Sequence, residues 1–278
     1  MPYRHAHWWV LACLGVILLG FWPSYWSVVT TSPWPFHLHG IVATVWVLMV
    51  ASQSWSIHQK KRELHRATGQ ASLYLFPFLI MGLFAIGTRN AQGYVNDPSP
   101  VTTMFGESFL LGLWVAVAAY VVLFYNAMKY RRKVWTHSAF MLGTPVILFE
   151  SPAGRAMNGF VPGLTIRGPE DFGRVLDGIL VSDGLMIALC LVLWWRAKKH
   201  SNAWGVVAGF VALQFVLMWA AYHLLDVEHW VRAAGTLPMP LMLVLGFAVG
   251  AATSWLGWQA GKRPGRTPAM PAAGSAAA

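Results

Sequence analysis

The chain has 278 residues, of which 56% are hydrophobic and only 11% are charged. This composition excludes an ordinary soluble domain of this size and indicates a polytopic membrane protein. The formal net charge of +10 does not indicate a nucleic-acid partner, because in a membrane protein the position of the charges matters more than their sum.

Crossing a membrane takes about 20 predominantly apolar residues per helix. By this criterion we expect an all-α, polytopic integral membrane helix bundle with about eight transmembrane helices. They would form one domain over residues 1–260, and the low-complexity segment 261–278 is expected to be a disordered cytoplasmic tail. In chain order, the predicted spans are 8–28, 36–57, 69–88, 105–127, 136–152, 175–195, 204–224 and 238–258.

Basic residues alternate between the two sides of the predicted spans. Fifteen lysines and arginines fall on the side of the two termini, in connections such as 60–66, 129–133 and 196–199, and five fall on the other side. Because cytoplasmic loops carry an excess of Lys and Arg, we expect both termini in the cytoplasm and the chain in a bacterial cytoplasmic (inner) membrane. The basic loops should attract anionic lipid headgroups.

Two of these basic junctions have similar sequences. The segments "KKRELHRATG" (60–69) and "RRKVWTHSAF" (131–140) each place a histidine five residues after a basic residue, at matching points between two spans. This similarity predicts a helix-hairpin repeat, 36–88 against 105–152. Chance similarity between two basic loops is the alternative interpretation.

The same junctions resemble known proteins. A histidine followed by Arg and Gly at a helix start ("LHRATG"), then a second histidine ("THSAF") and an arginine that closes the next span ("ESPAGR"), resemble an uncharacterised bacterial multi-spanning membrane-protein family of unknown function. The resemblance covers roughly residues 36–156 and implies the fold class without a mechanism. This chain lacks the second Arg that follows the first His-Arg in the fuller pattern. It is more distantly similar to membrane b-type cytochromes, but no histidine pair has the spacing that lets one helix serve two haems.

Two histidines are expected at one depth on the cytoplasmic side. His65 and His137 would occupy matching positions in the two hairpins, on different helices. Two histidines so placed are typical axial ligands of a b-type haem. The alternative is that both lie at the level of the headgroups, beside basic loops.

The outer side carries a second group of histidines. His37 and His39 lie two residues apart, so a helix turns only one of them inward, and we expect that one to be His39. His223 and Asp226 share one face of the seventh span, and an aspartate beside a histidine suits a metal ligand or a proton carrier. We therefore expect a zinc or iron site formed by His39, His223 and Asp183. The alternative is an interfacial histidine beside a solvated aspartate.

Several acids fall within or at the ends of predicted spans. Asp183 lies inside the sixth span, where an ionised carboxylate costs about 2.5–3.5 kcal/mol, so it should be protonated, paired or in contact with water. Glu150 closes the fifth span, which is short and interrupted, and Arg155 follows it. Asp177 belongs to the outer ends. Broken spans often line transporter binding sites, although ordinary kinks are the alternative.

Three functions follow from these residues. The first is a redox membrane protein that binds haem b or a quinone, an apolar small molecule, through His65 with His137 or through His39 with His223. The second is a metal-dependent membrane enzyme with the outer His/Asp site. The third is a proton-coupled transporter, or a membrane assembly or binding protein. We rank the redox protein first, because two independent histidine pairs are available to it.

Overall fold

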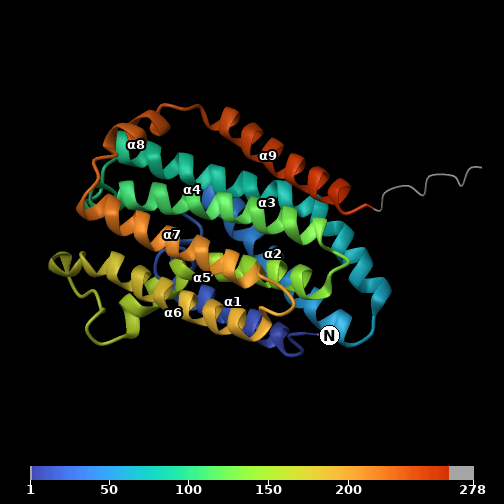
Figure 1. The fold of residues 1–278 in the computed structure, drawn as a ribbon. Coiled ribbons are helices and arrows are strands. Elements are labelled where there is room, and N and C mark those ends of the chain that lie inside the picture. The colour runs from blue at the N-terminus through green and yellow to red at the C-terminus, as the bar shows by residue number, and fades with distance from the viewer. Residues whose placement is uncertain (1, 263–278) are drawn as a thin grey trace, which may run out of the picture.

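The computed structural model describes residues 2–262. Within these residues all regular secondary structure is helical (Figure 1). The predicted disordered tail lies outside the described residues, except for Gly261 and Lys262. The helices are α1 (Ala6–Gly20), η1 (Trp26–Val28), α2 (Trp34–His58), α3 (Arg62–Asn96), α4 (Pro100–Lys129), α5 (Val134–Phe160), η2 (Pro169–Asp171), α6 (Arg174–Ala197), α7 (Ala203–His223), α8 (Glu228–Gly235) and α9 (Met239–Ala260).

Six of the described helical segments are long and apolar enough to cross a membrane. They are α2, α3, α4, α7, α9 and the segment Pro169–Ala197, which contains α6. The chain is therefore an integral, multi-pass membrane protein. α1 is a shorter apolar helix of 15 residues. α5 has 27 residues and is not among the six.

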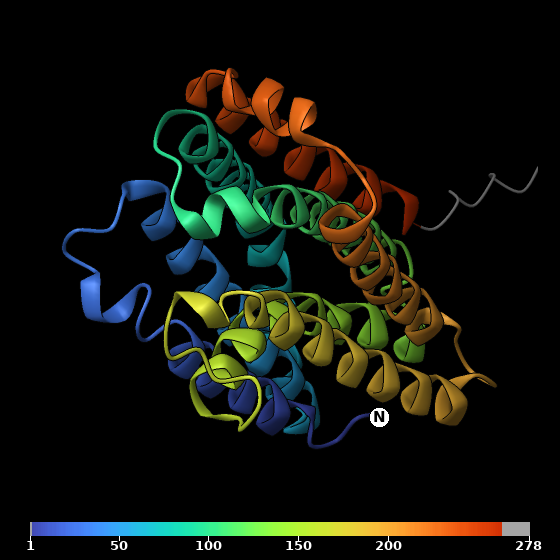
Figure 2. The same cartoon turned by 90° about the vertical axis from the view of Figure 1, so that its left-hand side faces the viewer.

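The long helices reverse direction at each connection, which gives the bundle two ends (Figure 1). At the right-hand end of Figure 1, α2 leads into α3, α4 into α5 and α6 into α7. We call this the basic end, because its connections 59–61, 130–133 and 198–202 are rich in Lys and Arg. The opposite end faces the viewer in Figure 2, where the segment between α1 and α2 projects from the bundle.

α4 and α5 form the centre of the bundle. α4 packs against α3, α5, α7 and α9, and α5 packs against α1, α4, α6 and α7. α2 packs mainly between α1 and α3, whereas α7 packs against α4, α5 and α6. As a result, α2 and α7 lie on different sides of the α4–α5 hairpin and do not pack against each other.

The observed helices differ from several predicted spans. The first predicted span, 8–28, is an α-helix only to Gly20, since the chain then enters turns around Pro23 and the short η1. α3 is longer than its predicted span at both ends. The fifth span was predicted as short and interrupted. That prediction is wrong in extent, because α5 continues through both of its prolines to Phe160.

The Thr144 hydroxyl replaces the backbone hydrogen bond that α5 loses at its first proline. Pro145 has no N–H to offer the carbonyl of Met141, four residues earlier. The Thr144 hydroxyl donates to that carbonyl instead, at 2.8 Å, and it accepts the indole N–H of Trp46 from α2 at 2.9 Å. The Tyr120 hydroxyl of α4 donates to the Thr144 carbonyl at 3.0 Å. In this way Thr144 continues α5 and joins it to two other helices.

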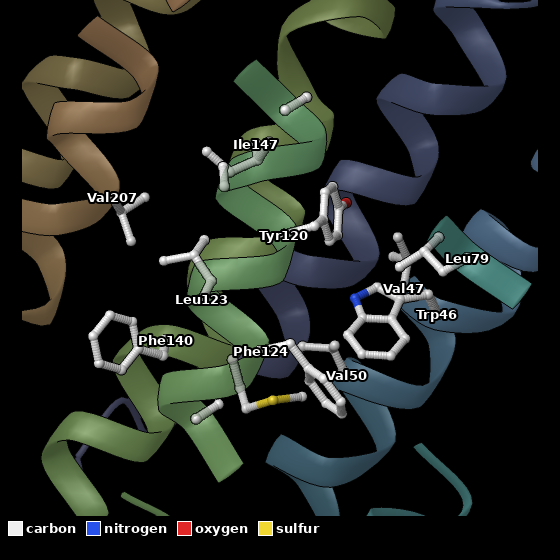
Figure 3. Packing of buried hydrophobic residues seen from close by; sticks show 14 of the residues in the cluster. Trp46, Val47, Val50, Leu79, Tyr120, Leu123, Phe124, Phe140, Ile147 and Val207 are labelled. Carbon is white, nitrogen blue, oxygen red and sulfur yellow. The ribbon is translucent and has the colours of Figure 1, made fainter. Parts of the chain in front are cut away.

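Aromatic side chains fill the centre beside this junction. Figure 3 shows Trp46 and Phe124 reaching toward each other from separate helices. Their ring centroids are 5.3 Å apart, and Phe76 of α3 stacks on Phe124 at 4.1 Å. All three side chains are fully buried. This packing fixes α2, α3 and α4 relative to one another and positions the residues at the basic end.

Candidate cofactor site

A cavity of about 510 Å³ lies at the basic end. α3 and α5 do not pack directly against each other, and residues from the first turns of both helices line the cavity. α2, the α4–α5 connection and the end of α9 provide the other walls. We call it the basic-end cavity. Its volume is within the range of about 300–1,000 Å³ that is usual for small-molecule sites.

His65 enters this cavity from α3. It is the fourth residue of that helix, and its backbone N–H bonds to the carbonyl of Lys61 at 3.0 Å. Its ring Nδ1 lies 3.3 Å from the carbonyl oxygen of Gln53, on α2. The side-chain amide of Gln53 in turn donates to the His65 carbonyl at 3.0 Å and to the Thr68 hydroxyl. Gln53 therefore holds the first turn of α3 and the His65 ring together.

His137 is placed in the same way on α5. It is also the fourth residue of its helix, and its backbone N–H bonds to Lys133 at 2.8 Å. Its Nδ1 lies 2.9 Å from the carbonyl oxygen of Ala127, in the last turn of α4. That carbonyl is one of the last four of a helix, which lack an intrahelical donor. Each histidine is thus anchored to the preceding helix of its own hairpin.

These contacts determine which ring nitrogen is available to a ligand. A carbonyl oxygen only accepts hydrogen bonds, so Nδ1 carries the proton in a neutral ring of His65 or His137. Nε2 then keeps its lone pair. A histidine held through Nδ1–H to a carbonyl, with Nε2 free, has the usual arrangement of a metal-ligating imidazole.

The basic-end cavity carries an excess of positive charge. Arg62, Arg66, Arg131 and Arg132 all line it. The two ion pairs among the described residues, Arg174–Asp171 and Arg232–Glu228, lie near the opposite end. Cations without carboxylate partners favour an anionic ligand group.

Arg131 is held firmly in the cavity wall. Its guanidinium donates to the carbonyls of Met128 and Trp258, at 2.9 and 3.0 Å, and lies 4.2 Å from the Trp258 ring centroid. Burial lowers the pKa of this guanidinium, and the neighbouring charge of Arg132 adds to that effect. Arg131 therefore joins α4 to α9 as well as adding charge to the cavity.

His58 has a different role at the same end. Its Nδ1 lies 2.6 Å from the carbonyl of Ser54, and its Nε2 lies 3.2 Å from the carbonyl of Pro2. Both nitrogens face acceptors, so His58 offers no lone pair to a ligand. It fixes the N-terminal segment beside the cavity, where Tyr3 also accepts the indole N–H of Trp204 at 2.8 Å.

The predicted outer histidines do not meet. His39 packs toward α3, because a Cβ atom added at Gly82 would lie 3.1 Å from the Cα of His39. His37 bonds instead to the Tyr25 hydroxyl at 2.8 Å. His223 ends α7 beside the rings of Trp219 and Tyr222. Because α2 and α7 do not pack together, His39 and His223 are not brought to one site.

Nothing in residues 2–262 adds a metal site at that end. No group of three or more His, Cys, Asp or Glu residues in this part of the chain is placed to hold a metal ion. Asp226 is exposed and accepts the backbone N–H of Glu228 at 3.2 Å, as α8 begins. Asp177 is exposed in the first turn of α6.

Three other predicted residues do come together, in the middle of the bundle. Glu150 and Asp183 interact electrostatically, and so do Glu150 and Arg155. Gln214 of α7 lies beside the Glu150 side chain. The Arg155 side chain is exposed, and its guanidinium lies 5.3 Å from the Phe21 ring centroid.

Sequence reasoning missed the groups that orient the two cavity histidines. A sequence motif cannot identify the carbonyls of Gln53 and Ala127 as partners, since every residue has a carbonyl group. The available signal was positional. Lys61 and Lys133 each precede a histidine by four residues at the start of a helix, so the first turn of that helix places the ring beside the end of the preceding helix.

No protein-family profile, curated protein or solved structure matches this chain.

Proposed function

We propose that this chain is a redox membrane protein that binds a b-type haem in the basic-end cavity, with His65 and His137 as the axial ligands. One observation carries the proposal. Two histidines from different helices line one cavity, and each is held through Nδ1 by a carbonyl so that Nε2 keeps a lone pair. The haem would supply one-electron chemistry.

The rest of the cavity lining suits the same ligand. Val50, Met141 and Leu142 offer apolar contacts for a macrocycle. Arg62 and Arg66 have no carboxylate partner among the described residues, and they would pair with the propionates. The protein would therefore hold the group in place, balance its charge and fix the orientation of both imidazoles.

A quinone is the second ligand that this cavity suits. Its two carbonyl oxygens accept hydrogen bonds, and Arg66 and Ser138 line the cavity with donors. The zinc or iron enzyme predicted from His39, His223 and Asp183 has no comparable support, because those residues are not brought together.

The proposal includes a placement in the membrane. All eight helices from α1 to α7 and α9 would cross it, with both termini and the basic end in the cytoplasm of a bacterium. The alternating directions of the helices and the concentration of Lys and Arg at the basic end support this orientation. Anionic lipid headgroups would then contact the basic connections. We also propose that the chain belongs to the multi-spanning membrane-protein family that residues 36–156 resemble.

An absorption spectrum of the purified protein tests the haem. After expression with sufficient haem, we expect a Soret band and the low-spin spectrum of a haem with two histidine ligands. His65→Ala or His137→Ala should lower the bound haem about tenfold or more, in line with the loss of a metal ligand. The matched control is His200→Ala, because His200 lies at the basic end and stacks on Trp135 outside the cavity lining.

Each outcome is decisive. If folded wild-type protein shows no Soret band, the haem proposal is wrong, and extraction of a bound quinone would then favour the second ligand. If both cavity variants keep full haem content, the ligands lie elsewhere.

A further inference from the structure

A layer of polar side chains crosses the middle of the bundle. Glu150, Asp183 and Gln214 belong to α5, α6 and α7, and each lies nine or ten residues from the opposite end of its helix. Ten residues of α-helix span about 15 Å. That is half of the roughly 30 Å hydrocarbon core, so in the membrane placement proposed above all three residues would lie near the bilayer midplane.

Close helix packing fixes the register of this layer. A side chain at Gly178 of α6 would lie 2.8 Å from the carbonyl oxygen of Gly154 on α5, so the two backbones touch there. The helices are antiparallel. Glu150 lies four residues before Gly154 on α5, and Ser182 lies four residues after Gly178 on α6, so the two touching faces also present Glu150 and Ser182. Asp183 is the next residue of α6 after Ser182.

The oxygens of this layer lack hydrogen-bond donors. Both carboxyl oxygens of Asp183, the Oε2 of Glu150 and the hydroxyl of Ser182 are buried without a partner. Asp183 is 1% exposed and Ser182 is 0% exposed. Gln214 of α7 lies beside Glu150. Unpaired buried polar groups are rare, and each points to something that completes it.

If Glu150 and Asp183 were both ionised, the nearby positive charge would not balance their two negative charges. Among the described residues, Arg155 is the cation within electrostatic reach of Glu150, and the two acids repel each other. α7 contributes the neutral Gln214. α1 and α4 contribute Cys13 and Tyr120, which bond to the carbonyls of Pro145 and Thr144. One arginine therefore faces two acids in this layer, and a second ionised carboxylate at this depth is costly.

We propose that Glu150 and Asp183, together with Ser182 and Gln214, form a binding site for one exchangeable proton in the middle of the bundle. When a proton arrives from water, the pair changes from two carboxylates to one carboxyl and one carboxylate. The carboxyl O–H donates to an oxygen that lacks a donor, and Arg155 balances the remaining negative charge. This site is independent of the basic-end cavity.

Infrared spectroscopy of the full-length protein in phosphatidylcholine vesicles tests the proposal. A protonated carboxyl has a C=O stretch separate from the carboxylate bands, and it shifts in D2O when the proton exchanges. We expect such a band in the wild-type protein, with an amplitude of about one carboxyl per chain that falls as pH rises. Asp183→Asn should abolish it, because Glu150 then has Arg155 as its counter-ion, whereas Glu150→Gln should keep the band and change the pH at which it is lost.

The controls separate this site from other acids and from the haem proposal. Asp177→Asn, on the exposed first turn of α6, should leave the band unchanged. His137→Ala should leave it unchanged as well, whether or not haem is lost. If one carboxyl variant fails to fold, the other still tests the assignment.

Three results would overturn the proton site. The first is a folded wild-type protein without the band at any pH. The second is a band that survives Asp183→Asn. The third is a band that disappears on addition of sodium at constant pH, which would indicate a cation site instead.

Discussion

Trp46 donates its indole N–H to the Thr144 hydroxyl at 2.9 Å, although 98 residues separate the two in the chain. Neither side chain is exposed to solvent. The hydroxyl also caps the carbonyl that Pro145 leaves free. One side chain therefore maintains the central helix and joins it to its neighbour.

We predict that Thr144→Val lowers the stability of the protein by about 2–4 kcal/mol, because it leaves a buried indole N–H and a buried carbonyl without partners. Thr144→Ser keeps the hydroxyl and should cost less than half as much. Thermal unfolding in detergent, followed by circular dichroism, measures both. A Thr144→Val protein that loses no more stability than Thr144→Ser would show that the two hydrogen bonds of the hydroxyl do not provide the stabilisation.

Arg131 gives a second prediction, at the basic end. Its guanidinium satisfies two helix-terminal carbonyls and packs on the Trp258 ring. Arg131→Lys keeps the charge but loses the planar fork, so we expect a loss of about 1 kcal/mol and a lower unfolding temperature. Arg132→Ala is the control, since Arg132 lines the same cavity without a hydrogen bond to another helix. An unchanged unfolding temperature in Arg131→Lys would mean that the positive charge of Arg131, and not its planar guanidinium, provides its contribution to stability.

The sequence was informative wherever a property repeats along a helix. Apolar runs located the helices, and the distribution of Lys and Arg identified the basic end. Helix ends were less predictable. Pro23 was expected inside a span but follows the end of α1, whereas Pro145 was expected to interrupt α5 but does not. The continuation of α5 depends on tertiary contacts, because Thr144 and its partners compensate for Pro145.

The candidate sites illustrate the same limit. His65 and His137 occupy equivalent positions in two hairpins, so the sequence predicts their common depth, whereas their approach to one cavity depends on how the hairpins pack. His39 and His223 belong to helices that could be neighbours in some bundles but are separated here by the α4–α5 hairpin. Hydropathy does not encode the order of helices around a bundle. That order depends on close contacts such as the one between Gly154 and Gly178.

Orientation in the membrane gives a third prediction. In a background with Cys13→Ala and Cys190→Ala, we introduce one exposed cysteine at each end, as Lys199→Cys or Arg167→Cys. A membrane-impermeant maleimide added to intact bacteria should label the Arg167→Cys protein, and it should label Lys199→Cys only after the cells are permeabilised. The reverse pattern would place the basic end outside the cytoplasm.

The contact between α5 and α6 gives the last prediction. Gly178→Ala would place a methyl group 2.8 Å from the Gly154 carbonyl oxygen and 2.9 Å from the Asn158 side chain. The backbone cannot yield easily, so we expect a loss of about 1–3 kcal/mol from overpacking. Gly184→Ala on the same helix is the matched control, because nothing lies within 4 Å of a side chain there.

Gly184→Ala should be neutral or slightly stabilising, because alanine favours a helix more than glycine does. Thermal unfolding of the two variants side by side measures the difference. Since the Gly154–Gly178 contact also sets the register of Glu150 against Ser182, Gly178→Ala should reduce the infrared carboxyl band as well as stability. A Gly178→Ala protein as stable as Gly184→Ala would show that α5 and α6 are not in such close contact, and it would remove the register on which the proton site depends.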